Sequence, residues 1–186
     1  MSELQQALFD DVSLPEAASQ SAPATARGIV AAPADPALVA LAASLPAGLH
    51  LGTSSWSFPG WAGLVYGEAY SESALARGGL RAYAQHPLLG AVGIDRTFYA
   101  PIAATDYARY AAQVPAAFRF LVKAPMAVTS SWLRDERGNF IDSPNFLDAA
   151  WTIDEFVQPC LAGLAAHAGP LVFQFPPQGR ETTRNP

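Results

Sequence analysis

Short continuous apolar runs alternate with segments of helical spacing along the chain. Runs of strand length cover residues 49–56, 91–95, 118–125 and 171–175, and their starts lie about 30 to 50 residues apart. Continuous runs are typical of parallel strands, because helices cover both faces of a parallel sheet. The pattern therefore predicts an α/β fold in which parallel strands alternate with helices.

The segments between these runs have the spacing of helices that pack one side against a core. Asp35 can cap the first helix, along which Leu38, Leu41 and Leu45 recur on one side. We predict helices over residues 35–45, 73–86, 106–114 and 146–166, the last kinked at Pro159, and a long loop over residues 126–145.

Composition changes at both ends of this pattern. Residues 1–34 are rich in Ala, Ser, Pro and Gln and hold few large apolar groups, which predicts a flexible tail. Residues 35–178 carry the strand and helix pattern and are expected to fold. Residues 179–186 are polar and without periodicity, and we interpret them as an aberrant or truncated ending.

Charge and cysteine content narrow the function classes. A net charge of -5 offers no basic field for phosphates, so neither nucleic acid nor an anionic membrane surface is an expected partner. With one cysteine and no export signal, the sequence favours the cytoplasm. The histidines lack metal-ligand spacing and no phosphate loop or serine elbow is present, so we predict no metal site and can name no cofactor.

Polar residues interrupt the apolar runs near their carboxyl ends. Ser54 ends the first run, Asp95 and Thr97 follow the second, and Lys123 and Gln174 lie late in the third and fourth. In α/β proteins the carboxyl ends of parallel strands form the ligand-binding face. These side chains are therefore candidates for a common site.

Lys123 is the strongest candidate, because an ammonium group in an apolar strand must be paired or reach solvent. It could bind an anionic substrate, act as a base or form a Schiff base, and it could equally be a structural partner of Asp95. Asp95 itself could be a general base, a metal ligand or that partner. Gln174 could orient a polar ligand or bond the backbone.

Aromatic residues follow the first two strands and could form a stacking wall for a flat ligand. Loop packing is the alternative, which we prefer for Trp61 and Tyr66. Trp56 and Tyr99 lie nearer the strand ends, so we predict that these two contact the ligand. The cluster comprises Trp56, Phe58, Trp61, Tyr66, Phe98 and Tyr99.

Taken in order, several motifs resemble the YecE-like family, or domain of unknown function 72. They are LGTSSWSFPGW, VY, RAYAQH, IDRTFY, FRFLVKAP and GPLVFQFPP, within residues 49–178. The resemblance implies a TIM-type (β/α)8 barrel of which this chain holds about four βα units, and the family's activity is not established. It also implies pocket positions at Gly52, Ser54, Trp56, Thr97, Phe98, Tyr99, Lys123, Gln174, Pro176 and Pro177.

The chain departs from the family pattern at three positions and in its length. Gly93 stands in place of a glutamate, Asp95 in place of an asparagine and Ser130 in place of a histidine, which weakens any proton transfer built on the lost groups. The motifs of the second half of the family are missing. We therefore expect a half barrel, truncated or frameshifted, whose open edge could self-associate.

Three functions remain open on the sequence alone. The first is an enzyme acting on a small polar or anionic ligand through Lys123, Asp95 and Gln174. The second is a fragment without catalytic activity, and the third is a module that binds a small ligand without turnover. The sequence does not decide whether the protein is an enzyme.

Overall fold

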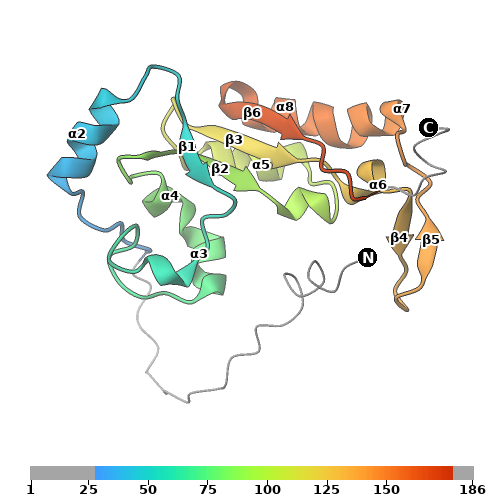
Figure 1. Cartoon of the computed structure of the whole chain (residues 1–186), viewed down its shortest axis with the longest axis horizontal. Coiled ribbons are helices and arrows are strands. Elements are labelled where there is room, and N and C mark those ends of the chain that lie inside the picture. Colours follow the sequence, from blue (N-terminus) through green and yellow to red (C-terminus); the bar gives the residue numbers. More distant parts are fainter. Residues whose placement is uncertain (1–27, 178–186) are drawn as a thin grey trace, which may run out of the picture.

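The four apolar runs form one parallel sheet with the order β1-β2-β3-β6 (Figure 1). The computed structural model describes residues 28–177. The predicted parallel α/β arrangement is confirmed within them. The strands are β1 (Leu51–Thr53), β2 (Leu89–Ile94), β3 (Arg119–Lys123) and β6 (Ala168–Val172).

Helices connect the successive strands, as a parallel sheet requires. The last predicted helix contains a π-helical turn, η3 (Ile153–Val157), which ends two residues before Pro159. Proline has no N–H to donate to the Glu155 carbonyl, so the regular α-helical hydrogen bonding is interrupted there. None of the helices in residues 28–177 is long and apolar enough to cross a membrane. The connecting helices are α3 (Glu72–Gly78), α4 (Leu80–Tyr83), α5 (Ala104–Ala111), α7 (Ala149–Thr152) and α8 (Gln158–Leu164), and the 3-10 turns are η1 (Pro59–Trp61), η2 (Arg96–Phe98) and η4 (Ala165–His167).

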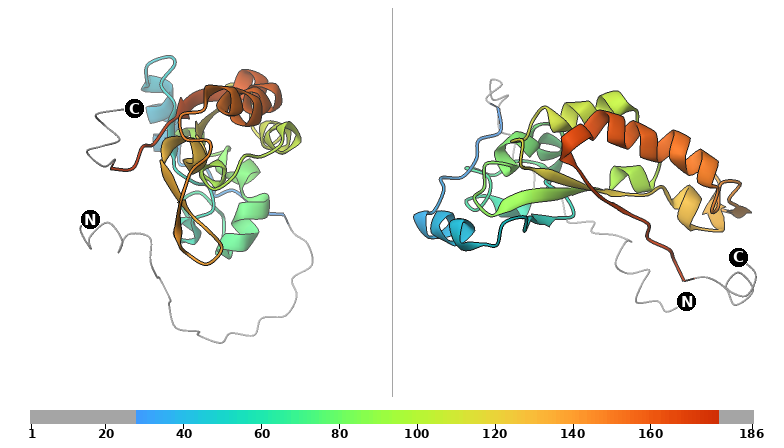
Figure 2. Two further views of the ribbon diagram at one scale, coloured as in Figure 1. Left: turned by 90° about the vertical axis from the view of Figure 1, so that its right-hand side faces the viewer. Right: turned by 90° about the horizontal axis from the view of Figure 1, so that it is seen from above.

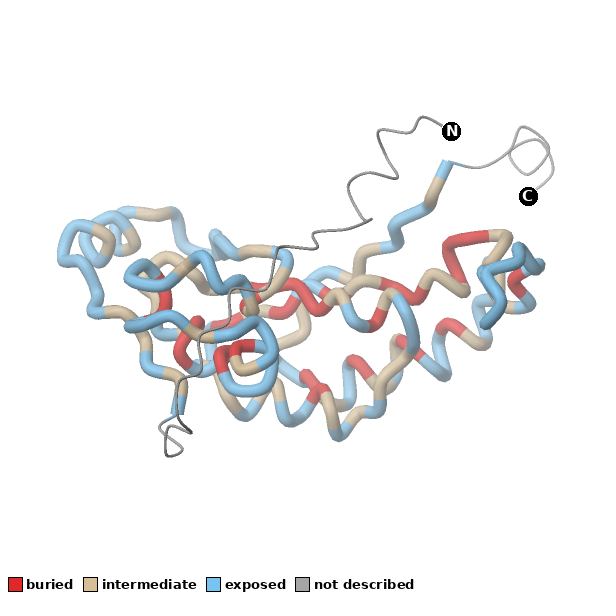
Figure 3. The backbone as a smooth tube through the Cα atoms, turned by 90° about the horizontal axis from the view of Figure 1, so that it is seen from below, coloured by how far each residue is buried: buried red, intermediate tan, exposed pale blue. Residues whose placement is uncertain are grey.

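Side chains alternate between the two faces of the sheet, and only one face is covered by helices. In β3, Phe120 and Val122 are fully buried in the core, whereas Leu121 is 37% exposed on the opposite face. Helices α5 and α8 lie side by side over the covered face (Figure 2). Buried positions accordingly recur at intervals along the helices and within the strands (Figure 3). The expectation that helices cover both faces is wrong for this part of the chain.

The last strand begins and ends earlier than the sequence predicts. It spans Ala168–Val172 instead of residues 171–175. Phe173 and Phe175 lie beyond it and are 41% and 49% exposed. A continuous apolar run is typical of a strand buried on both faces, but here one face of the sheet is open, and Phe173 and Phe175 lie exposed beyond the strand.

The predicted long loop over residues 126–145 contains regular structure. It folds into α6 (Met126–Thr129) and an antiparallel hairpin of β4 (Trp132–Arg134) and β5 (Phe140–Asp142). The Asp135 carboxylate accepts hydrogen bonds from the backbone amides of Arg137 and Asn139, and these bonds shape the turn. Each strand has only three residues, too few for their alternation to stand out in the sequence.

The amino-terminal part of the described chain differs from the prediction in two ways. Helix α2 (Pro36–Ser44) is present and capped by Asp35, but none of its residues is buried, so it does not pack as an amphipathic helix. Order begins before residue 35, because the Ala32 amide donates to the Val65 carbonyl. The rest of the predicted tail, and residues 179–186, lie outside the described residues.

Helices α5 and α8 approach closely at a glycine. A Cβ atom on Gly163 would lie 2.3 Å from the Ala104 carbonyl oxygen and 2.5 Å from the Tyr107 Cβ. Tyr107 and Cys160 are buried between the same helices, and burial raises the pKa of the Cys160 thiol to about 11. Cys160 is therefore a packing residue of the core.

Substitution of Gly163 by alanine should destabilise the protein. Alanine is normally more favourable than glycine in a helix interior by about 1 kcal/mol. A net decrease in the free energy of unfolding therefore reports the clash with α5, and we expect the clash to cost about 1–3 kcal/mol. Urea denaturation measures the change. The control is Gly78→Ala, where the nearest atom, Ile29 Cγ1, is 3.6 Å away, an ordinary contact. A Gly163→Ala protein as stable as this control would contradict the close helix contact.

Candidate functional site

The carboxyl ends of β1, β2 and β3 border a cavity of about 350 Å³ on the sheet face opposite the helices. We call it the strand-end cavity. Its floor is formed by small residues of adjacent strands, which leave room above the sheet. The lining residues are His50, Gly52, Thr53, Ser54, Ala91, Val92, Gly93, Asp95, Leu121 and Lys123.

Lys123 and Asp95 form an ion pair in this cavity. The Lys123 Nζ lies 3.3 Å from the Asp95 Oδ1 and 5.5 Å from the centre of the Phe98 ring. The lysine side chain is 23% exposed and the aspartate side chain 40%. Such a partly exposed pair contributes only about 0–1 kcal/mol to stability. The pair therefore orients the ammonium group more than it stabilises the fold.

Glycine at position 93 allows β1 and β2 to pack closely beneath the cavity. A Cβ atom on Gly93 would lie 2.7 Å from the Ser54 carbonyl oxygen, so any side chain would push the end of β1 away. A Cβ atom on Gly52 would meet the Ala91 carbonyl oxygen at 2.1 Å. Both glycines are therefore required by strand spacing, and at Gly93 the glutamate of the family pattern could not be accommodated without a shift of the backbone.

Thr97 joins the ends of β2 and β3 through its hydroxyl group. Its side chain is fully buried, and its Oγ1 lies 2.9 Å from the Ile94 carbonyl oxygen and 2.6 Å from the Lys123 carbonyl oxygen. The Thr97 hydroxyl thus ties the turn after β2 to the end of β3. In this arrangement Thr97 positions Asp95 and Lys123 relative to each other.

The other predicted site residues lie in different environments. Ser54 lines the strand-end cavity with Lys123 and Asp95. Trp56 is 8% exposed, its Nε1 donates to the Leu75 carbonyl at 3.2 Å, and it borders a smaller cavity of about 240 Å³. Tyr99 is 80% exposed, and Gln174 is exposed beyond the end of β6. The structure brings together Lys123, Asp95 and Ser54.

Sequence reasoning missed His50 and Leu121 as cavity residues. Residues two apart in a strand point to the same face of a sheet, and this signal is present in both cases. His50 and Gly52 share the side of Ser54, and Leu121 lies two residues before Lys123. In a strand buried on both faces this period does not distinguish a cavity side from a core side, so the prediction of two covered faces hides the signal.

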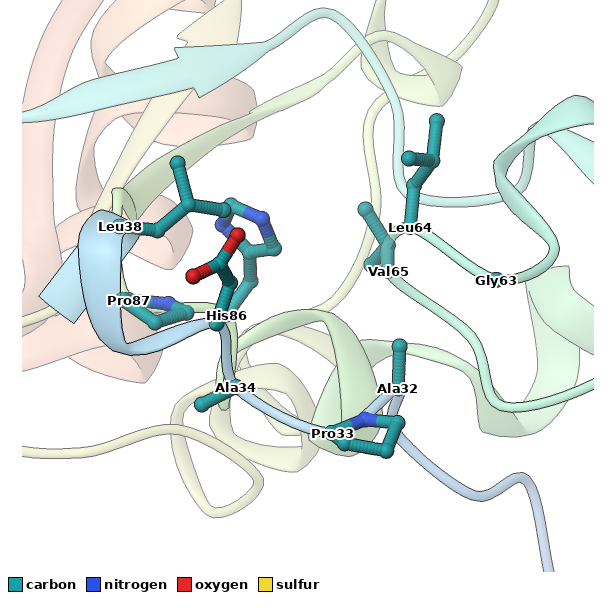
Figure 4. A pocket seen from close by; sticks show the side chains of 10 residues that line it. Ala32, Pro33, Ala34, Leu38, Gly63, Leu64, Val65, His86 and Pro87 are labelled. Carbon is teal, nitrogen blue, oxygen red and sulfur yellow. The ribbon is translucent and has the colours of Figure 1, made fainter.

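A second hollow of about 140 Å³ lies between the start of α2, residues 63–65 and the turn before β2 (Figure 4). Leu38, His86 and Pro87 lie on one side of it and Val65 on the other. The His86 Nδ1 accepts a hydrogen bond from the Leu88 amide, and burial lowers the pKa of His86. The His86 ring therefore completes a local turn.

No group of three or more His, Cys, Asp or Glu side chains in residues 28–177 is arranged to hold a metal ion. The strand-end cavity offers an ammonium, a carboxylate, hydroxyl groups and one imidazole. This set can contact an anion or a polar group, and it can hold a proton at Lys123, Asp95 or His50.

Comparison with known proteins identifies the family. The model of the family described as "Protein of unknown function DUF72" matches residues 50–185. The chain belongs to the DUF72 family. The resemblance inferred from the sequence motifs is thereby confirmed. No curated protein matches the chain significantly.

A DUF72 protein from Enterococcus faecalis shares the fold. Its crystal structure at 3.10 Å resolution has a TM-score of 0.51 and 19% sequence identity to this chain, and the match covers 73% of this chain and 43% of that one. A second crystal structure of that protein, at 2.52 Å, gives a TM-score of 0.35 at 19% identity, covering 56% and 39%. This DUF72 chain thus spans less than half the length of its solved relative.

Thr97→Val should destabilise the DUF72 protein and loosen the site. Valine has the same shape but leaves the Ile94 and Lys123 carbonyls without the hydroxyl donor, which should cost about 1–3 kcal/mol. Thr97→Ser keeps the donor and is the matched control. Thermal unfolding of both variants measures the difference. Equal stability of the valine and serine proteins would show that the hydroxyl does not tie β3 to the turn.

Proposed function

We propose that the strand-end cavity binds a small polar or anionic molecule whose principal contact is Lys123. The observation that carries this proposal is the placement of the chain's single lysine in the cavity, paired with Asp95 through one carboxylate oxygen. An ammonium group has three donors, and the ion pair with Asp95 uses one. The remaining donors can reach a ligand oxygen.

The surroundings of Lys123 favour binding of an anion. Leu121 and Ala91 are apolar neighbours in the lining, and they lower the local dielectric constant so that a charged contact is stronger than in water. The Ser54 hydroxyl can donate to or accept from the same ligand. The Asp95 carboxylate opposes an anion but holds the ammonium in place.

The same geometry supports two versions of the function. In an enzyme, the Lys123 amine would be the reacting or proton-holding group and Asp95 its partner. In a binding module, the ligand would bind saturably without turnover. A fragment without catalytic activity would lack both properties. We favour a ligand-binding site, because Lys123 and Asp95 converge with Ser54 on one cavity.

We further propose that the four strands are part of a TIM-type barrel. We also propose that the chain lies in the cytoplasm and that it self-associates through the open sheet edges. Support comes from the family, and from the edges: in the described residues, β1 and β6 each bond to one strand only. Leu51 on β1 and Phe173 and Phe175 after β6 are large exposed apolar residues near these edges. Unpaired strand edges readily bond to another chain.

Lys123→Met should weaken binding of a small anion. With pyruvate and inorganic phosphate as probes, loss of a charged hydrogen bond of about 1.5–3 kcal/mol lowers affinity by at least about tenfold. Asp95→Asn should instead strengthen binding, by at most about fivefold for a pair worth up to ~1 kcal/mol. Isothermal titration calorimetry or NMR titration measures both.

The matched control for this experiment is Arg119→Met. It removes one positive charge from the same strand, but Arg119 bonds the Ala116 and Phe118 carbonyls at the other end of β3. Its affinity should equal that of the unmodified protein. If Arg119→Met and Lys123→Met weaken binding equally, the anion responds to net charge and the Lys123 site is wrong.

Leu51→Lys should shift the protein towards the monomer. Charged residues on an edge strand oppose pairing with another chain, and Leu51 is 40% exposed, so the fold should tolerate the change. Sedimentation velocity at micromolar concentrations measures the shift. Leu161→Lys, at a position 50% exposed on α8, is the control. A monomeric unmodified protein would end the self-association proposal.

A further inference from the structure

A wider cleft of about 720 Å³ adjoins the strand-end cavity. It is formed by the segment that follows β1 and by the start of α3, and we call it the aromatic cleft. Thr53 and Ser54 line both hollows, so the two adjoin at the end of β1. The lining of the aromatic cleft also includes Ser55, Ser57, Phe58, Gly60, Trp61 and Glu72.

Two aromatic rings form one wall of the aromatic cleft. Phe58 is 56% exposed, and its ring meets Trp61 edge to face, with centroids 5.4 Å apart and planes at 73°. The Phe58 ring lies against the backbone of Gly60, where a Cβ atom would be 2.4 Å from the ring. Glycine at this position therefore lets the Phe58 ring rest on the loop. The exposed Phe58 ring, backed by the half-buried Trp61, offers a surface for stacking.

The remaining wall of the aromatic cleft is polar. The Ser55 and Ser57 hydroxyl oxygens are 3.0 Å apart and hydrogen bonded, and each hydroxyl can both donate and accept. Among the described residues, Glu72 alone brings a charged side chain to this lining. A carboxylate accepts hydrogen bonds strongly from hydroxyl groups. The wall therefore suits a ligand with several hydroxyl groups and repels an anion.

The strand end between the two hollows is fixed. The Tyr83 hydroxyl accepts a hydrogen bond from the Thr53 amide at 3.1 Å, and the Thr53 Oγ1 donates to the Ser55 carbonyl at 2.7 Å. A molecule that spans the end of β1 would therefore meet a rigid support. On one side it would find the Lys123 ammonium, and on the other the rings and the Glu72 carboxylate.

We propose that the aromatic cleft binds a hydroxylated ring and that the same molecule carries an acidic group to Lys123, so that the ligand is a sugar acid. The C–H face of the ring stacks on the aromatic wall, and its hydroxyl groups bond Glu72 and the serines. An apolar ring would leave these polar groups unpaired, at a cost in affinity. The position of the acidic group rests on the proposed function of Lys123.

The experiment uses D-glucuronate and D-galacturonate, with D-glucose and D-galactose as their neutral counterparts. Saturation-transfer NMR on the full chain reports which ligand protons contact the protein. We expect both uronates to bind, with the strongest transfer to the ring C–H protons, and the neutral sugars to bind more weakly. Phe58→Ala should weaken every sugar by about tenfold through loss of stacking and buried area.

The matched control is Phe140→Ala, because Phe140 on the hairpin is also 56% exposed and lies outside the aromatic cleft. Glu72→Gln should weaken all four sugars, whereas Lys123→Met should weaken only the uronates. The cleft proposal is overturned if no uronate binds, or if Phe58→Ala and Phe140→Ala have the same effect.

The outcome also separates the two proposals. If Phe58→Ala weakens the uronates and Lys123→Met does not, the ring site stands and the sugar-acid class is rejected; the anion site at Lys123 is rejected as well only if Lys123→Met leaves pyruvate binding unchanged. If Lys123→Met weakens pyruvate and the uronates while Phe58→Ala changes neither, the anion site stands and the aromatic cleft is rejected as a ring site.

Discussion

One-sided burial is the constraint on which the rest of this structure depends. Because side chains alternate along a strand, the residues of β3 that fill the core, Phe120 and Val122, force Leu121 and Lys123 onto the opposite face. The helices supply apolar contacts for Phe120 and Val122 only. The second pair is left to line the strand-end cavity, so the core and the candidate site are specified by the same five-residue strand.

Close strand packing determines which groups converge in that cavity. Gly52 and Gly93 let the backbones of β1 and β2 approach, and the buried Thr97 hydroxyl holds the turn after β2 against the end of β3. Asp95 lies in that turn, directly before η2, and its carboxylate therefore reaches the Lys123 ammonium. The ion pair is a product of backbone geometry, and its modest contribution to stability agrees with its partial exposure.

Most of the fold can be predicted from sequence patterns that span several residues. The predictions fail where the conformation depends on the surroundings of a single residue. The alternation of apolar runs with segments of helical spacing predicts the parallel sheet. The positions of Lys123 and Asp95 at strand ends predict that the two side chains lie close together. The hairpin was missed because each strand is so short. The environments of Trp56 and Tyr99 depend on loop conformation, since Trp56 turns inward to bond Leu75 while Tyr99 faces solvent.

A single lysine in the sequence has a practical consequence for work on this protein. Apart from the chain's amino terminus, Lys123 carries its one primary amine, and that amine lines the strand-end cavity. Acylating or reductively methylating reagents therefore modify one side chain, at the candidate site. A fluorophore or an isotope-labelled methyl group attached in this way would be a reporter in the cavity itself, without any change to the sequence.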